Sequence, residues 1–127
     1  MIQLTYTSQA AQELTSGDIF KIIETSSRNN LRDELTGFLI YSGDSFFQLI
    51  EGPEVSIDAL FDRISGDPRH KQVNILSRKQ VEERAFPKWR MKRVSPKSVS
   101  VGDPIEGLDS APHYVRRAVA EFLNPNA

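Results

Sequence analysis

Two strand-like segments separated by a tight turn constrain the fold of this 127-residue chain more than any other feature. Residues 35–41 and 45–51 are dominated by aliphatic and aromatic side chains, and Ser42-Gly43-Asp44 between them has the composition of a turn. Together these segments predict a β-hairpin. Because a hairpin must bury one face, the helical patterns before and after it predict helices packed on a sheet.

Two amphipathic helices are predicted, one on either side of the hairpin. In the first, Thr15 is a suitable N-cap, and Asp18 can complete a capping box with it. The second begins at Gly52-Pro53 and ends at Gly66, the positions that proline and glycine prefer around a helix. The core-facing residues of the second helix are Ile57, Leu60, Phe61 and Ile64.

The remaining segments complete the predicted fold. Residues 2–8 alternate between apolar and polar side chains and predict a half-buried strand, while residues 72–81 and 89–94 predict two more strands. After a loop at 95–112, residues 114–123 predict an amphipathic helix, which either covers the far face of the sheet, the commoner arrangement, or joins a dimer. The order predicts an α+β, ferredoxin-like βαββαββ sandwich, with two helices on one face of a mixed four- to five-stranded sheet, plus the C-terminal helix.

Composition argues against several classes of function. The chain has no cysteine, which excludes disulfides, thiolate metal sites, cysteine nucleophiles and light chemistry through a cysteinyl adduct. His70 and His113 are far apart in sequence, so we expect no metal site. The net charge of −1 predicts no general attraction to nucleic acid or to an acidic membrane. With no membrane-length apolar run and no signal-peptide pattern, the predicted location is the cytoplasm.

Basic residues surround Trp89 in the last predicted strand, and they have two interpretations. The residues concerned are Lys88, Arg90, Lys92 and Arg93. A basic stretch with an aromatic residue is compatible with nucleic-acid binding. A solvated, charged edge strand that resists aggregation is the commoner role of such a pattern. We therefore expect no nucleic-acid partner.

Three polar residues occupy positions where the pattern favours apolar ones. Tyr6 and Gln48 lie on the apolar faces of their strands, and Asn30 lies on the apolar face of the first helix. A buried amide or phenol needs hydrogen-bond partners, and each offers both a donor and an acceptor. Three such groups around one space would suit a flat heterocycle such as an isoalloxazine ring. A tyrosine bonded only to backbone is the commoner alternative, and the pattern alone leaves both open.

Six segments of the chain, taken together, carry a family resemblance. They are Leu4-Thr5-Tyr6-Thr7-Ser8, Ser27-Arg28-Asn29-Asn30, Leu35-Thr36-Gly37-Phe38-Leu39-Ile40-Tyr41, Phe46-Phe47-Gln48-Leu49-Ile50-Glu51-Gly52-Pro53, Asp67-Pro68-Arg69-His70 and Arg84-Ala85-Phe86-Pro87-Lys88-Trp89-Arg90-Met91. In this order and at this spacing, over residues 1–95, they resemble the BLUF family of blue-light sensors that use FAD. The separation of Tyr6 from Gln48 and the ending Trp89-x-Met91 are the most specific parts of the match.

The resemblance implies a noncovalently bound flavin between the two helices and over the sheet, with FAD expected and FMN as the alternative. It gives Tyr6 the role of the photoactive tyrosine, Gln48 that of the switching glutamine, and Asn30 a hydrogen bond to the flavin ring at O4 and N3. Trp89 and Met91 match two residues of the final strand whose placement, near the flavin or away from it, is debated in the family. The other predicted flavin contacts are Ile23, Ser26 and Phe46, together with Asp67, Arg69 and His70 near the ribityl and phosphate end.

We expect residues 1–95 to form the sensor domain and residues 96–127 a loop and helix extension. Such an extension is too short for an enzymatic output domain, so we expect a sensor that is not an enzyme and that signals through a partner protein or a change of assembly, as a homo-oligomer. One alternative is a small ferredoxin-like enzyme of acylphosphatase type, but residues 9–15 lack the arginine that would cradle an anion. The other is a protein-binding module without flavin, against which the three polar residues argue.

Overall fold

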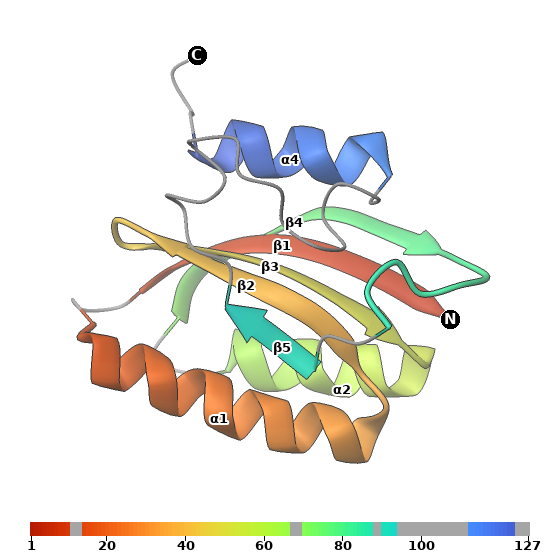
Figure 1. Cartoon of the computed structure of the whole chain (residues 1–127), viewed down its shortest axis with the longest axis horizontal. Helices are drawn as coiled ribbons and strands as arrows, with labels where there is room; N and C mark the ends of the chain where they lie inside the picture. Colours follow the sequence, from red (N-terminus) through yellow and green to blue (C-terminus); the bar gives the residue numbers. More distant parts are fainter. Residues whose placement is uncertain (11–13, 67–69, 88–89, 94–111, 124–127) are drawn as a thin grey trace.

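Three helices and five strands make up the described part of the chain, which comprises residues 1–10, 14–66, 70–87, 90–93 and 112–123 of the computed structural model (Figure 1). In chain order they are β1 (Ile2–Ala10), α1 (Ser16–Asp33), β2 (Thr36–Ser42), β3 (Ser45–Gly52), α2 (Glu54–Ser65), β4 (His70–Gln80), β5 (Arg90–Arg93) and α4 (His113–Leu123). This order confirms the predicted succession of elements. Within this described part, no helix is both long enough and apolar enough to cross a bilayer.

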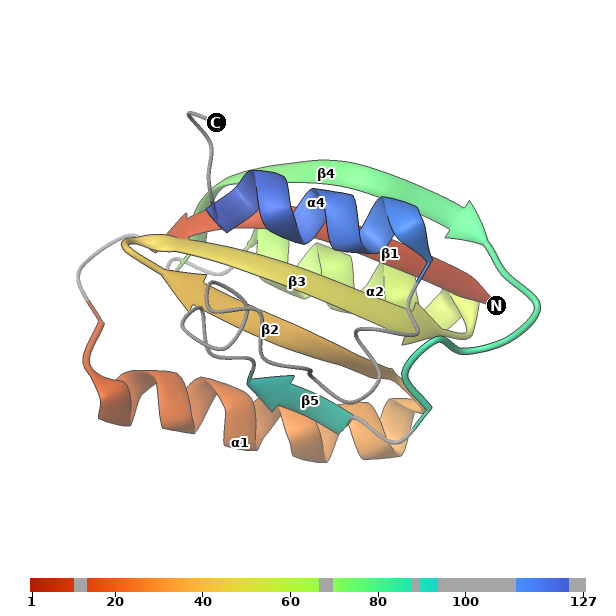
Figure 2. The ribbon, with the colours of Figure 1, turned by 45° about the horizontal axis from the view of Figure 1, so that its top comes forward.

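The five strands form one sheet with the order β4-β1-β3-β2-β5. β1 pairs antiparallel with β3 and β4, β2 pairs antiparallel with β3, and the short β5 is parallel to β2. Helices α1 and α2 cover one face, here called the helix-pair face, and α4 lies across the other, the α4 face (Figure 1, Figure 2). The prediction of a ferredoxin-like, mixed sheet with two helices on one face is confirmed.

Local sequence signals set several element ends where they were predicted. The Asp18 N–H donates to Thr15 Oγ1 at 3.1 Å, and the Thr15 N–H donates to Asp18 Oδ2 at 2.9 Å, so the capping box that starts α1 is present. Gly43 in the hairpin turn has a φ of 65°, which glycine adopts without a steric penalty. Gly66 follows the last residue of α2, as predicted.

Apolar side chains are buried on both faces of the sheet. On the helix-pair face, Ile50 and Ile57 belong to one cluster, and Ile19 and Phe46 belong to another. The cluster on the α4 face consists of Phe38, Ile40, Phe47, Leu49, Phe86, Val115 and Val119. Helix α4 therefore covers its own sheet, as its amphipathic pattern predicted.

β1 is not the half-buried strand that its alternation predicts. Gln3 and Thr5, on the polar side of the pattern, are only 2% and 1% exposed. The reason is α4: the Tyr114 hydroxyl of that helix donates a hydrogen bond to Gln3 Oε1. The alternation of residues within a strand indicates only which face is polar. It cannot predict that α4 covers this face, because Tyr114 lies 111 positions after Gln3 in the chain.

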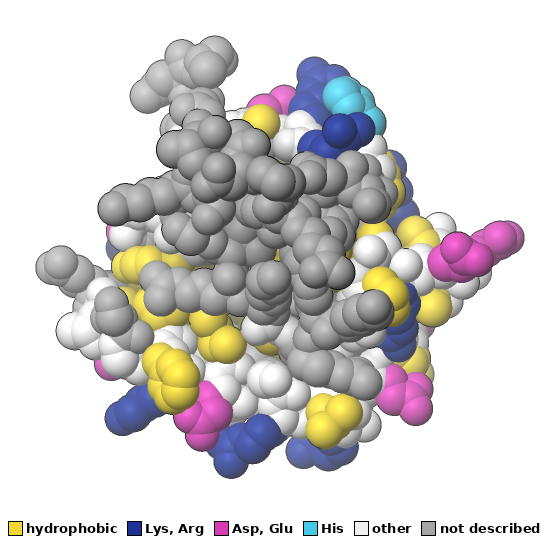
Figure 3. All heavy atoms as spheres, in the orientation of Figure 1, with side chains coloured by type: hydrophobic (Ala, Val, Ile, Leu, Met, Phe, Trp, Pro, Cys, Tyr) yellow, Lys and Arg dark blue, Asp and Glu magenta, His cyan; other side chains and the backbone are white. Residues whose placement is uncertain are grey.

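The outward side of α1 carries scattered apolar side chains. Phe20 and Leu31 are 66% and 61% exposed. Along the lower edge of Figure 3, where α1 lies, hydrophobic side chains stand among Lys, Arg, Asp and Glu side chains. Apolar residues dispersed in this way are ordinary on a protein surface. They do not by themselves indicate a binding site.

Candidate functional site

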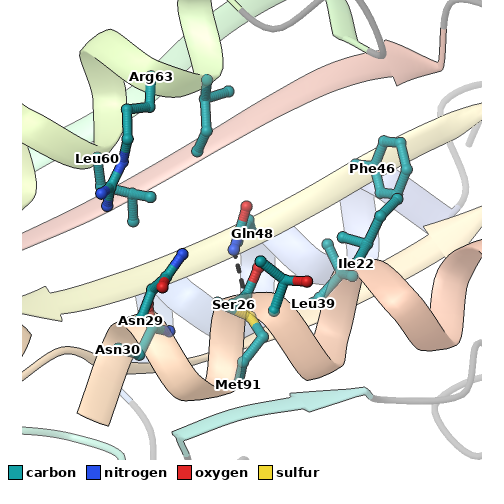
Figure 4. A pocket seen from close by; sticks show the side chains of 12 residues that line it. Ile22, Ser26, Asn29, Asn30, Leu39, Phe46, Gln48, Leu60, Arg63 and Met91 are labelled. Carbon is teal, nitrogen blue, oxygen red and sulfur yellow. Dashed lines mark hydrogen bonds between the residues drawn. The ribbon is translucent and has the colours of Figure 1, made fainter. Parts of the chain in front are cut away.

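A cavity lies between α1, α2 and the sheet, at the place predicted for a flat ligand (Figure 4). Its volume is about 180 Å³. Both helices and three strands contribute to its wall. The lining residues are Ile22, Thr25, Ser26, Asn29, Asn30, Leu39, Phe46, Gln48, Leu60, Arg63, Ile64 and Met91.

The helical repeat explains which residues of α1 reach this cavity. Residues three and four apart lie on one side of a helix, and Ile22, Ser26 and Asn29 follow that spacing. Ser26 and Asn30, both predicted to contact the ligand, line the cavity. Ile23, the third predicted residue of this helix, is not among the lining residues, and it packs instead against the cluster that contains Ala10. Its neighbour Ile22 takes the position in the cavity wall.

Tyr6 and Gln48 form the centre of the site. They are direct cross-strand partners on β1 and β3, and the Tyr6 hydroxyl donates a hydrogen bond to Gln48 Oε1. Gln48 Nε2 in turn donates to Met91 Sδ on β5 at 3.2 Å (Figure 4). Tyr6 is fully buried and does not line the cavity, which it reaches only through Gln48. A hydrogen-bonded row Tyr6–Gln48–Met91 therefore runs along the wall of the cavity.

Met91 reaches Gln48 from an irregular point of β5. Arg90 pairs with Gly37 and Lys92 pairs with Phe38, so Met91 is an extra residue in the ladder, a β-bulge. Its φ of 147° is unusual for a residue with a side chain. Bulges turn a side chain toward a new direction, and here the side chain is only 4% exposed and lies against Gln48. A thioether sulfur accepts hydrogen bonds only weakly, so this contact holds the amide loosely.

Polar groups that the sequence pattern did not single out complete the cavity wall. Arg63 of α2 brings a guanidinium group to the cavity, and its Nη2 lies 3.4 Å from Asp33 Oδ2. Asn29 adds a second amide beside Asn30, which is fully buried. Arg63 follows the predicted core residue Leu60 by three positions, so the helical repeat was a signal that could have identified it.

The remaining predicted residues lie at the border of the described chain or beyond it. Phe46 lines the cavity, as expected for its strand face. His70 begins β4 and pairs with Ala10, but its side chain lies outside the described atoms. Asp67, Arg69 and Trp89 lie outside the described residues. Their predicted roles stay predictions.

The donor set fits a flat ring with a polar edge. Three amides, two hydroxyls and one guanidinium group line the cavity, and these are the side chains of Asn29, Asn30, Gln48, Thr25, Ser26 and Arg63. Amides can both donate and accept, and a guanidinium group donates in a plane. Leucine, isoleucine, phenylalanine and methionine side chains form the rest of the wall. Such a cavity can hold an aromatic heterocycle and recognise carbonyl and imide groups along one side of it.

Burial fixes the protonation state of Tyr6. Removal of the phenol from water raises the pKa of Tyr6 well above its ordinary value. The residue is therefore a neutral hydrogen-bond donor throughout the physiological range, as its bond to Gln48 Oε1 requires.

Above about pH 10, the ordinary pKa of tyrosine, we expect the free energy of unfolding to fall with a slope that Tyr6 contributes. The unfolded chain loses the Tyr6 proton first, so the folded state binds more protons and stability decreases as the pH rises, by about 1.4 kcal/mol per pH unit. Urea denaturation at a series of alkaline pH values measures this slope. Tyr6→Phe removes the titrating group, so equal slopes in the wild-type protein and the variant would contradict the prediction.

Three comparisons relate the chain to known proteins. The family model described as "BLUF: Sensors of blue-light using FAD" matches residues 1–92. The chain is 31% identical to the photoactivated adenylate cyclase subunit beta of Euglena gracilis, over 94% of this chain and 15% of that protein. It is 33% identical to the blue light- and temperature-regulated antirepressor BluF of Escherichia coli (strain K12), over 55% of this chain and 17% of that protein.

Solved structures share the fold at similar levels of identity. The dark-state structure of BlrB, titled a BLUF protein, superposes with a TM-score of 0.78 and 34% identity, covering 96% of this chain and 92% of that chain. By contrast, this chain spans only 15% and 17% of the two curated relatives named above.

Proposed function

The chain belongs to the BLUF family of blue-light sensors that use FAD, and from this premise we propose that the row Tyr6–Gln48–Met91 is the part that responds to light. Membership makes the domain a flavin-binding photoreceptor. The observation that carries the proposal is the hydrogen-bonded row itself, which passes along the cavity wall from a buried phenol to a thioether. The family match does not favour an enzyme of acylphosphatase type.

Several residues of this chain would hold the flavin. Asn30 and Asn29 offer amides to the polar edge of the ring, and Arg63 offers a guanidinium group on the opposite helix. Ile22, Leu39 and Phe46 supply apolar surface for the ring faces. Ser26 lies between the polar and apolar parts of the wall. Of the residues predicted for the ribityl and phosphate end, Arg69 and His70 stay predictions, as does Asp67.

A bound flavin supplies absorption of blue light and, once excited, oxidising power. Tyr6 is the oxidisable side chain behind Gln48, and Gln48 is the group that can exchange donor for acceptor, by rotation of its amide or by tautomerisation. If the amide turns over, Nε2 faces the Tyr6 oxygen, and Oε1 faces the Met91 sulfur. A thioether has no proton to donate, so the turned state loses its contact with Met91. The turned state is therefore less stable in this row, and we propose that it returns in the dark.

Family membership establishes a flavin cofactor, and the identity of that flavin and the route of the output signal belong to the proposal. FAD is the expected flavin, because the family description names it, and FMN is the alternative. The relatives whose names include adenylate cyclase suggest that a BLUF domain can regulate a separate enzymatic unit. We propose that this chain is itself no enzyme and acts on a partner protein or through a change of assembly. The cytoplasmic location and the homo-oligomer stay predictions of the sequence.

The purified protein tests the function directly. We expect it to be yellow, with a visible absorption band that shifts to the red under blue light and returns in darkness. Absorption spectra before, during and after illumination measure the shift, and chromatography of the flavin released on denaturation identifies FAD or FMN. A colourless protein that takes up neither flavin on reconstitution would refute the proposal.

A further inference from the structure

We propose that Glu51 is a positioning residue for the light-responsive row: its buried carboxylate fixes the segment that leads into β5 and so sets the place of Met91 against Gln48. Glu51 lies on β3, three residues after Gln48, and points to the opposite face of the sheet. It is fully buried, and it pairs across the strands with Gln3, just as Gln48 pairs with Tyr6. The inference rests on the proposed function, because it concerns the same row.

Four donors converge on this carboxylate. Oε1 accepts from the Phe86 N–H at 2.6 Å and from the Thr36 hydroxyl at 3.4 Å. Oε2 accepts from the Ala85 N–H at 3.0 Å and from Gln3 Nε2 at 3.2 Å. An ionised carboxylate has about four lone-pair sites, so its accepting capacity is used completely. Two of the four donors are backbone groups of residues 85 and 86, which Glu51 thereby ties to the end of β3.

Arg84 fastens the same segment from its other side. Its Nη1 donates to Thr36 Oγ1 and to the Glu51 carbonyl oxygen, both at 2.9 Å, and its Nη2 donates to the Glu34 carbonyl oxygen at 2.6 Å. Thr36 thus accepts from Arg84 and donates to Glu51. The side chain of Phe86, 2% exposed, packs edge to face on Phe38 with the ring centres 5.1 Å apart.

The anchored segment leads into β5, which otherwise packs against α1 and pairs with β2. β5 has four residues and is bonded to β2 along one side, through a ladder interrupted by the bulge at Met91. Phe86 precedes Met91 by five positions, so the fixed end of the segment lies within a short reach of the bulge. Release of Ala85 and Phe86 would let β5 shift, and the weak contact between Gln48 Nε2 and Met91 Sδ would be the first to lengthen.

A second branch of the same network leads away from the row and provides an internal control. Gln3 Oε1 accepts from the Tyr114 hydroxyl of α4, and Lys79 Nζ lies 3.6 Å from the centre of the Tyr114 ring. Tyr114→Phe removes the link to α4 and leaves the four donors of Glu51 in place. If Glu51 acts through β5, the light response depends on the carboxylate and not on the Tyr114 hydroxyl.

Glu51→Gln is the decisive variant. The amide keeps one acceptor oxygen and turns an NH₂ group toward two donors, so half of the convergent bonds fail. We expect flavin to stay bound and the lit state to return to the dark state about tenfold more slowly, because the Met91 contact that favours the dark state is weakened; tenfold is the change that one charged hydrogen bond corresponds to. Glu83→Gln, the same change at an exposed position of the same segment, and Tyr114→Phe should both keep the wild-type recovery rate.

Hydrogen exchange provides a readout that needs no light. In Glu51→Gln we expect faster exchange at the amides of Ala85 and Phe86, and also at Met91 and Lys92 of β5. Faster exchange at residues 85 and 86 with unchanged β5 and unchanged recovery would overturn the proposal, because Glu51 would then be only a structural brace. If Glu51→Gln does not fold, Thr36→Val, which removes one donor to Glu51 and one acceptor of Arg84 at nearly constant shape, should slow recovery about threefold. A wild-type protein without a light response would instead refute the proposed function.

Discussion

Replacement of Gln48 by leucine is expected to abolish the red shift under blue light while flavin stays bound. Leucine fills a similar volume but neither donates nor accepts, so the Tyr6 hydroxyl loses its acceptor and Met91 loses its donor. The cavity keeps Asn30, Asn29 and Arg63, which we propose as the main polar contacts of the ring. Absorption spectra before and after illumination, together with the flavin content per protein, measure both halves of this prediction.

Two companion variants sharpen the result. Tyr6→Phe removes only the hydroxyl, and it should also abolish the shift, because the row then lacks its first donor. Gln80→Leu, the same exchange at an exposed position at the end of β4, should leave the shift unchanged. A shift of wild-type size in Gln48→Leu, with normal flavin content, would show that the light response does not pass through this amide.

Gly37→Ala is expected to be the most destabilising small substitution in the described sheet. A Cβ atom at residue 37 would lie 1.8 Å from the Leu49 carbonyl oxygen and 3.1 Å from the Ile50 Cα. Both are backbone atoms of β3, so no side-chain rotation can relieve the clash. Gly37 also pairs with Arg90 at the start of β5. We expect a loss of about 3 kcal/mol or more, a large part of the stability of a domain of this size.

Two other glycines serve as matched controls for that measurement. Gly17 lies in the first turn of α1, where a Cβ would meet only Thr15 Oγ1 at an ordinary 3.7 Å, so Gly17→Ala should stabilise by up to about 1 kcal/mol. At Gly43 a Cβ meets nothing within 4 Å, but φ is +65°, so Gly43→Ala isolates the cost of the backbone conformation, about 1–2 kcal/mol. Urea denaturation compares all three, and equal losses at residues 37 and 43 would contradict a steric origin.

The features that local sequence predicted correctly have local causes. The capping box of Thr15 and Asp18, the hairpin turn at Gly43 and the end of α2 at Gly66 each depend on neighbouring residues. The apolar stripe of α4 likewise follows from helical spacing within one segment. Two of the five residues of α1 that line the cavity, Ser26 and Asn30, were predicted for the same reason, because they repeat at helical intervals.

The features that escaped prediction depend on contacts between distant segments. The bulge that turns Met91 inward forms only when β5 pairs with β2. The paired residues, such as Gly37 and Arg90, lie more than fifty positions apart in the chain. Glu51 reads as a polar strand residue, and its role emerges from donors that lie 34 and 35 positions away. Arg63 is an intermediate case, because its position on α2 was predictable and only its approach to the cavity was not.

The position of β5 at the border of the sheet has a mechanical consequence. In the described residues it is hydrogen-bonded along one long side only, to β2, and it packs against α1. A strand in the middle of a sheet cannot move without disturbing two neighbouring strands. An edge strand of four residues has one strand neighbour, so it can tilt while β1, β3 and β4 stay in register. The Gln48 amide thus links a buried phenol on β1, an interior strand, to a methionine on the edge strand β5. A small change at Gln48 can therefore displace β5 at the edge of the sheet without deforming the rest of the domain.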